Sequence, residues 1–245
     1  MSLHLYGVVR HGHPVPPDLV GVRSGGVRLV ESDAVAAVTT DVPDDIEVTE
    51  DDAERHLEVL TALVADGPVL PLRLGTVAPD EDAVRAEVLD ALDDLPEQLD
   101  ALDGLIEVHV DVGDDEDTRL RAVLEEDPAL RARAGTSAAS DLEERVGLGE
   151  AVAARLAEHR AVDGDAVAEW LAPIAVASTL RGEDDGWVLR AAYLIREVDL
   201  RRFDEALERL HAEYGGALSF SRVGPLPVFS FAVDSGRGGS SRWGW

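Results

Sequence analysis

The stretch from Pro68 to Thr76 constrains the fold most, because it has the pattern of a strand and lies between two helix patterns. Leu70, Leu72 and Leu74 recur with period two, so they point to one side of an extended chain while Arg73 points to the other. We therefore predict a strand over residues 68–76 with an aliphatic face for a core and an arginine on the opposite face. The flanking helix patterns place this strand in a sheet on which helices pack.

The first hundred residues predict a sheet-plus-helix domain. Strand patterns occupy residues 3–9, 27–30 and 34–39, and the last two are expected to form a hairpin. Thr49 and Asp52 have the spacing of a capping box and should begin a helix. Its buried stripe is expected at Ala53, Leu57, Leu60 and Val64. A second helix should follow Pro79, and a change of composition near residue 100 predicts the end of an N-terminal α+β domain, residues 1–100.

The second half has the order β-α-β-β-α-β, which is typical of a ferredoxin-like sandwich. Strand patterns lie at residues 104–112, 174–180, 187–195, 217–222 and 228–233, and the first crossover is enlarged by helices up to residue 171. Asp199 is expected to cap a further helix that ends before Gly215. We predict a C-terminal ferredoxin-like domain over residues 101–233 and a flexible tail over residues 234–245. The overall class is therefore α+β, with two tandem domains.

Two glycines fall inside the long helix of the enlarged crossover. Gly147 and Gly149 each weaken a helix by about 1 kcal/mol relative to alanine. This loss predicts that another segment packs closely against the helix at these positions.

The chain contains no cysteine, which excludes disulfides, thiol catalysis and cysteine-ligated metals. No run approaches the roughly 18 uninterrupted apolar residues of a membrane span, and the N-terminus does not have the pattern of a signal peptide. A cytoplasmic location is expected from these patterns.

Charge is the strongest feature of the composition. Fifty acidic residues against twenty-two basic ones give a formal net charge of −28, and every basic residue is arginine. Such a field repels nucleic acid and anionic lipid, so neither is expected as a partner. The acidic surface has two interpretations that the sequence leaves open, namely a solvated surface and a surface recognised by a basic partner.

Motifs for catalysis and cofactor binding are incomplete. His11 and His13 have no evident third ligand for a metal, and the acidic run 111–117 does not have the ligand order of a calcium loop. Gly147 and Gly149 are not followed by the third glycine of a dinucleotide fingerprint, and a chain without lysine cannot form a Walker phosphate loop. We predict no catalytic residue, no metal and no cofactor.

Two features could serve either structure or binding. Arg73 could form a surface ion pair with one of many nearby acids, or its guanidinium could be presented to a partner. Phe229 and Phe231, on the last predicted strand, could form a binding stripe, although a core role is the favoured interpretation.

Four motifs, in order along the chain, are similar to those of the gas vesicle protein F/L (GvpF/GvpL) family. They are Tyr6-Gly7; Leu70, Pro71, Arg73, Gly75 and Thr76; Gly104, Glu107 and Val110; and Gly224, Pro225, Pro227, Ser230 and Phe231. The resemblance extends from Leu5 to Val233. The sequence departs from the family pattern at Leu226, where an aromatic residue is expected, at Phe229, where tyrosine is expected, and in residues 108–111, which do not contain the usual lysine.

The resemblance implies a non-enzymatic accessory protein of gas vesicle formation, either a minor shell component or an assembly factor. It implies a location at the gas vesicle in the cytoplasm, and as partners the hydrophobic shell subunit and other accessory proteins. Arg73 and Glu107 are the candidate partner contacts. The alternative is a small-ligand-binding or regulatory α+β module, by analogy with other ferredoxin-like domains.

Overall fold

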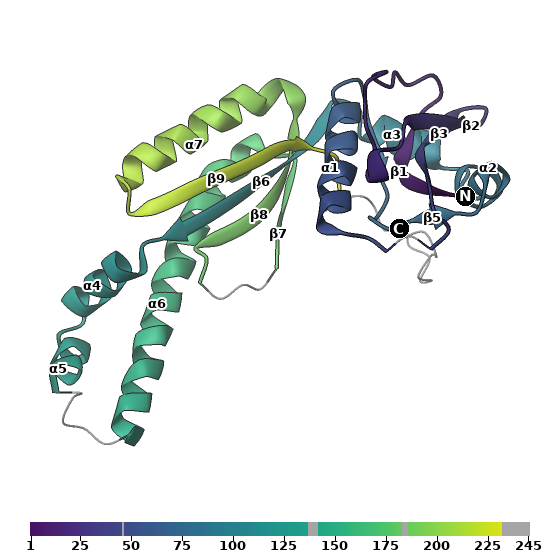
Figure 1. Cartoon of the computed structure of the whole chain (residues 1–245). Helices are drawn as coiled ribbons and strands as arrows, with labels where there is room; N and C mark the ends of the chain where they lie inside the picture. Colours follow the sequence, from purple (N-terminus) through teal and green to yellow (C-terminus); the bar gives the residue numbers. More distant parts are fainter. Residues whose placement is uncertain (46, 137–141, 183–185, 232–245) are drawn as a thin grey trace. The chain divides into compact units, whose positions relative to one another are not determined.

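The computed structural model describes residues 1–45, 47–136, 142–182 and 186–231 (Figure 1). Within these residues the chain forms two sheets, each accompanied by helices, so the predicted α+β class is confirmed. The chain divides into two units: one comprises residues 1–108 together with the segment that begins at Gly224, and the other comprises residues 109–223. The sequence-based prediction placed the division at residue 100, with residues 101–233 in the second domain.

The first unit is built on a sheet of strand order β2-β3-β1-β4, with β5 also paired to β1. Its strands are β1 (Ser2–Arg10), β2 (Val27–Glu31), β3 (Val35–Val42), β4 (Leu70–Pro71) and β5 (Val77–Ala78), and all pairs are antiparallel. The predicted hairpin of residues 27–39 is present as β2 and β3. The helices of this unit are α1 (Glu50–Val64), α2 (Glu81–Val84), a π-helical turn (Arg85–Leu89) and α3 (Leu95–Ala101).

Strand β1 is the centre of the first unit, because every residue from Leu3 to Val9 is buried. Alternate side chains of a strand point to opposite faces, so both faces of β1 must be covered. On one face, Tyr6 packs into a core with Val59, Leu60 and Leu63 of α1. Helix α3 also contacts β1.

Helix α1 begins as predicted but buries a different face. Thr49 and Asp52 form the capping box in both directions. The buried residues are Asp52, His56, Val59, Leu60 and Leu63. Leu57 is 39% exposed, so the predicted stripe is wrong at this position. The pattern failed because two polar residues, Asp52 and His56, occupy the inner face.

The predicted strand over residues 68–76 is also wrong in length. Only Leu70 and Pro71 pair with β1, and the chain then turns before β5 begins at Val77. Gly75 has a φ of +86°, a backbone conformation that interrupts an extended strand. Leu70 and Leu72 are buried as expected, whereas Leu74 lies in the turn and is 36% exposed.

The second sheet has the strand order β7-β8-β6-β9. Its strands are β6 (Leu105–Asp114), β7 (Ala177–Leu180), β8 (Leu189–Arg196) and β9 (Leu218–Leu226). The helices are α4 (Glu116–Glu126), α5 (Pro128–Thr136), α6 (Leu142–Leu171) and α7 (Leu200–Tyr214). This order of elements and strands is consistent with the ferredoxin-like arrangement and its enlarged first crossover. Asp199 precedes α7 but makes no side-chain cap, contrary to the prediction.

Close packing of α6 occurs at a glycine other than the two predicted. A Cβ atom at Gly147 or Gly149 would meet no heavy atom within 4 Å, whereas a Cβ at Gly164 would lie 2.3 Å from the carbonyl oxygen of Val188. Gly164 therefore allows α6 to approach the chain entering β8. The expected packing at Gly147 and Gly149 is wrong.

The segment after β9 is irregular rather than a strand. Residues 227–231 have no strand assignment, and Phe229 is 38% exposed while Phe231 is half-buried. The favoured core role of these two side chains is therefore wrong for Phe229. The predicted tail, residues 234–245, lies outside the described residues.

Candidate functional site

The loop between β4 and β5, residues 72–76, carries Arg73 and is tied to β1 at both ends. The Leu72 N–H donates to the Tyr6 carbonyl at 2.8 Å, and the Leu5 N–H donates to the Thr76 carbonyl at 2.9 Å. Within the loop, the Thr76 N–H and hydroxyl both donate to the Arg73 carbonyl, at 3.1 and 2.7 Å. We call residues 72–76 the Arg73 loop. These bonds hold its backbone in a defined turn.

The Arg73 side chain lies on the surface and pairs with no carboxylate among the described residues. Leu74 beside it is partly exposed, and Val48, which precedes α1, is 44% exposed. A Cβ placed on Gly75 would lie 3.5 Å from Val48, so this valine borders the loop. The loop therefore presents a guanidinium next to apolar surface, and the ion-pair interpretation of Arg73 finds no support in the described residues.

Behind the loop, a chain of hydrogen bonds passes through two buried histidines. His4 of β1 and His56 of α1 are 1% and 4% exposed, and His4 Nε2 lies 2.9 Å from His56 Nδ1. His56 Nε2 lies 3.1 Å from the Leu72 carbonyl oxygen. Because a carbonyl can only accept, we assign the proton to His56 Nε2, and His4 Nε2 then donates to His56 Nδ1. The pair thus links β1, α1 and the Arg73 loop.

Both imidazoles are held neutral by their surroundings. Burial lowers the pKa of His4 to about 4, with a further contribution from the neighbouring His56, while Asp52 acts in the opposite direction. Burial likewise lowers the pKa of His56 to about 4, against the effect of its bond to Leu72. His56 lies within the helix predicted to begin at Thr49, which is present as α1. The contact with His4 was missed, because two histidines 52 positions apart give no local signal.

Tyr6 continues this polar layer toward the loop of residues 20–26. Its hydroxyl donates to Thr40 Oγ1 at 3.0 Å and accepts from the Val22 N–H at 2.7 Å. Its ring stacks on His56 with a centroid distance of 5.2 Å. Gly21 packs so closely that a Cβ would lie 2.3 Å from the Tyr6 hydroxyl. The tyrosine of the Tyr6-Gly7 motif is therefore a buried structural residue.

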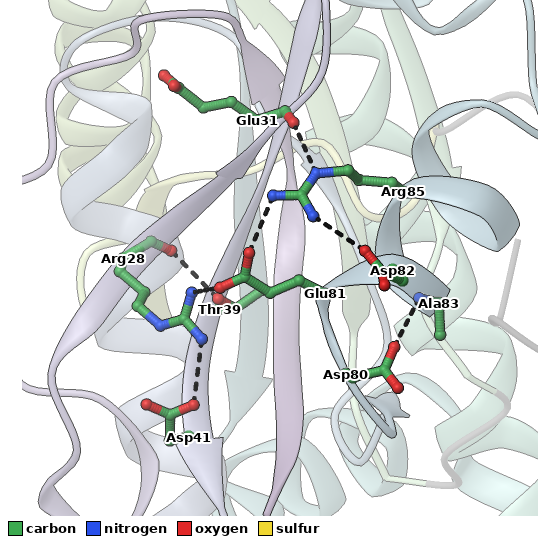
Figure 2. Close-up of polar contacts among 9 residues, drawn as sticks. All are labelled: Arg28, Glu31, Thr39, Asp41, Asp80, Glu81, Asp82, Ala83 and Arg85. Atoms are coloured by element: carbon green, nitrogen blue, oxygen red, sulfur yellow. Dashed lines mark hydrogen bonds and ion pairs between the residues drawn. The ribbon is translucent and has the colours of Figure 1, made fainter.

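A second polar group lies on the sheet surface of the first unit (Figure 2). Arg28 of β2 pairs with Glu81 at 2.6 Å and with Asp41 of β3 at 3.2 Å. Glu81 also pairs with Arg85 at 2.9 Å, and Arg85 Nε donates to the Glu31 carbonyl. These side chains join α2 to the strands β2 and β3. Burial disfavours the charged form of Arg28, but the bonds to Asp41 and Glu81 favour it more strongly. The pKa of Arg28 is therefore raised.

Glu107, the other candidate contact, is fully buried. Its carboxylate accepts from the Ser230 N–H and from the Ser230 hydroxyl, both at 2.7 Å. A Cβ at Gly224 would lie 2.9 Å from the Glu107 carbonyl oxygen, so the returning chain passes close to β6 here. The structure thus brings two of the motifs together, at Glu107 and Ser230. A buried carboxylate offers no surface to a partner, so Glu107 has a structural position and Arg73 an exposed one.

His11 and His13, which were considered as metal ligands, bond to two separate backbone carbonyl groups. His13 is buried and its Nε2 contacts the Leu63 carbonyl, while His11 Nδ1 contacts the Ser32 carbonyl. Within the described ranges, no group of three or more histidine, aspartate or glutamate side chains could hold a metal ion. In the same ranges, no helix combines the length and apolar character needed to cross a membrane.

Comparison with known proteins identifies the family. The sequence profile of "Gas vesicle synthesis protein GvpL/GvpF" matches residues 2–233. The chain is a member of the GvpL/GvpF family. Gas vesicle protein F of Streptomyces sp. (strain CB03234) is 32% identical to it over 237 residues, which cover 94% of this chain and 99% of the relative. The resemblance seen in the four motifs is therefore confirmed, and the chain has a role related to gas vesicles.

Solved GvpF structures share the fold. The crystal structure of GvpF from Anabaena sp. PCC7120 matches with a TM-score of 0.80 at 20% identity, over 96% of this chain and 99% of that one. GvpF from Microcystis aeruginosa matches with a TM-score of 0.73 at 22% identity, over 95% and 99% of the two chains. At these identities the comparison concerns the arrangement of elements. This chain therefore shares the α+β fold of GvpF over nearly its whole length.

Proposed function

We propose that this GvpL/GvpF protein is a non-enzymatic accessory protein of gas vesicle formation that contacts the hydrophobic shell subunit through the Arg73 loop. It acts as an assembly factor or as a minor shell component, and its place of action is the gas vesicle in the cytoplasm. The observation that carries the proposal is the exposed Arg73, which pairs with no described carboxylate although acidic residues exceed basic ones by twenty-eight.

The chemistry of the loop suits an apolar polypeptide partner. Leu74 and Val48 provide apolar surface that a hydrophobic subunit can cover. The guanidinium of Arg73 carries five N–H donors, which can bind backbone carbonyl groups of an unfolded or partly assembled subunit. Because the bonds to β1 hold the loop in one conformation, little loop entropy is lost on binding.

The net charge contributes in a different way. A protein of charge −28 repels other copies of itself, so a complex with an apolar subunit would stay dispersed. This effect is general, whereas the loop contact is local. The two contributions are therefore separable by substitution at Arg73.

The test is precipitation of the shell subunit followed by light scattering. The subunit is diluted from denaturant into buffer with the wild-type chain, with Arg73→Ala or with Arg55→Ala. Arg55 is the control, because it is a partly exposed arginine whose partner Glu58 lies on its own helix. We expect wild type and Arg55→Ala to delay precipitation equally, and Arg73→Ala to delay it several-fold less. Equal delay by all three proteins would contradict the loop contact, and no delay by wild type would contradict the proposed activity.

A further inference from the structure

The histidine pair behind the Arg73 loop is placed where a change of protonation alters three elements together. We propose that His4 and His56 form an acid-sensitive latch. The pair holds β1, α1 and the Arg73 loop together at neutral pH and releases the loop when the two imidazole rings take up protons. The inference goes beyond the proposed function, because it concerns the isolated protein and holds whatever the loop binds.

The latch follows from the donor and acceptor roles of the four nitrogen atoms. With both rings neutral, His4 Nε2 donates to His56 Nδ1, and His56 Nε2 donates to the Leu72 carbonyl. A first added proton goes to His4 Nδ1 and leaves the bond between the two rings intact, but it places a charge in a site that is almost without solvent contact. A second added proton leaves two N–H groups facing each other at 2.9 Å, which breaks the contact.

The surroundings offer little compensation for such a charge. Asp52 of α1 is the nearby acid, but its carboxylate already accepts from Thr49 and pairs with Arg23 at 3.2 Å. Tyr6 of β1 faces the pair with its ring, and its hydroxyl is bonded to Thr40 and Val22. Strands β4 and β5 contribute no titratable side chain. The buried charge becomes favourable only when the rings separate and reach solvent, and this separation breaks the hydrogen bond from His56 to the Leu72 carbonyl.

The response can be worked out for each imidazole. In an opened loop the pKa is near the ordinary 6.5, and in the closed structure it is about 4. Between pH 7.5 and pH 5 the ratio of opened to closed loop therefore rises by about 30-fold for one imidazole and up to about 10³-fold for both. The open form binds more protons, so acid favours opening.

The test is amide hydrogen exchange followed by NMR at pH 7.5 and pH 5, after correction for the intrinsic exchange rate. The reporters are the Leu72 and Thr76 amides, which bond to Tyr6 and Arg73, and the reference is the β2–β3 hairpin of the same unit. We expect the protection of the reporters to fall by more than 100-fold and to stay well below that of the hairpin at both pH values. Equal protection of reporters and hairpin would show that both exchange through unfolding of the whole unit and would overturn the latch.

His56→Gln separates titration from packing, because glutamine can still donate to Leu72 and accept from His4 but takes up no proton. We expect the loss of reporter protection between pH 7.5 and pH 5 to be about 30-fold or less in His56→Gln. In His11→Gln, which changes an exposed histidine, this loss should equal that of wild type. An unchanged response in His56→Gln would refute the proposal. If this variant does not fold, the wild-type imidazole resonances decide: His4 and His56 should stay neutral down to about pH 5 in the closed protein, and titration near pH 6.5 would refute it.

Discussion

The same substitution, glycine to alanine, should have opposite effects at two positions of α6. At Gly147 a Cβ meets open space, so Gly147→Ala should raise the free energy of unfolding by about 1 kcal/mol through helix propensity alone. At Gly164 the added carbon would lie 2.3 Å from the Val188 carbonyl oxygen. An ordinary contact needs about 1 Å more, so the backbone of α6 or of the chain entering β8 must move.

Overpacking of this kind costs about 1–3 kcal/mol or more, and here it meets backbone rather than a flexible side chain. Because the overlap is with backbone, we take the upper end of this range; after the gain of about 1 kcal/mol in helix propensity is subtracted, Gly164→Ala should lower the free energy of unfolding by about 2 kcal/mol. Urea unfolding followed by circular dichroism measures both variants against wild type. Equal stabilisation by the two substitutions would refute the close approach of α6 to Val188, and destabilisation by Gly147→Ala would refute the open surface at that glycine.

Three further changes test the first unit. Tyr6→Phe removes the hydroxyl shared by Thr40 and Val22, and should lower the free energy of unfolding by about 1–3 kcal/mol in urea titrations; no loss would contradict these buried bonds. Glu107→Gln weakens the charge-assisted bonds to Ser230 and should speed exchange of the Ser230 amide at least tenfold, whereas an unchanged rate would exclude that bond. Between pH 7 and pH 5, wild type should lose about 2 kcal/mol more stability than His56→Gln. The pKa of His56 is lowered from 6.5 to about 4 in the folded protein, so its contribution to stability is complete above pH 6.5 and falls as the pH approaches 4. Parallel pH profiles of the two proteins would contradict this.

Much of the fold could be predicted because it depends on local patterns. The capping box at Thr49 fixes the start of α1, and the alternation in residues 3–9 fixes β1. The order of elements predicted for the second half is consistent with the strand order β7-β8-β6-β9 of its sheet. Arg73 was singled out from its position in a motif, and the structure places it on the surface.

The errors come from interactions between distant residues. The predicted buried stripe of α1 left out Asp52 and His56, but both are buried, and they pair with Arg23 and His4, which are far away in the sequence. Gly164 has a role only because Val188 lies against it. Glu107 is buried because Ser230 returns to it across 123 positions. None of these contacts has a period or a spacing that a single sequence could reveal.

We propose that the chain acts in gas vesicle formation through its Arg73 loop. The most direct measurement is vesicle content, counted by electron microscopy, in cells that lack the chain and are complemented with wild type, Arg73→Ala or Arg55→Ala at equal protein levels. We predict vesicles with wild type and Arg55→Ala, and at least a several-fold lower count with Arg73→Ala. Normal vesicle formation in cells without the chain, or full complementation by Arg73→Ala, would contradict it.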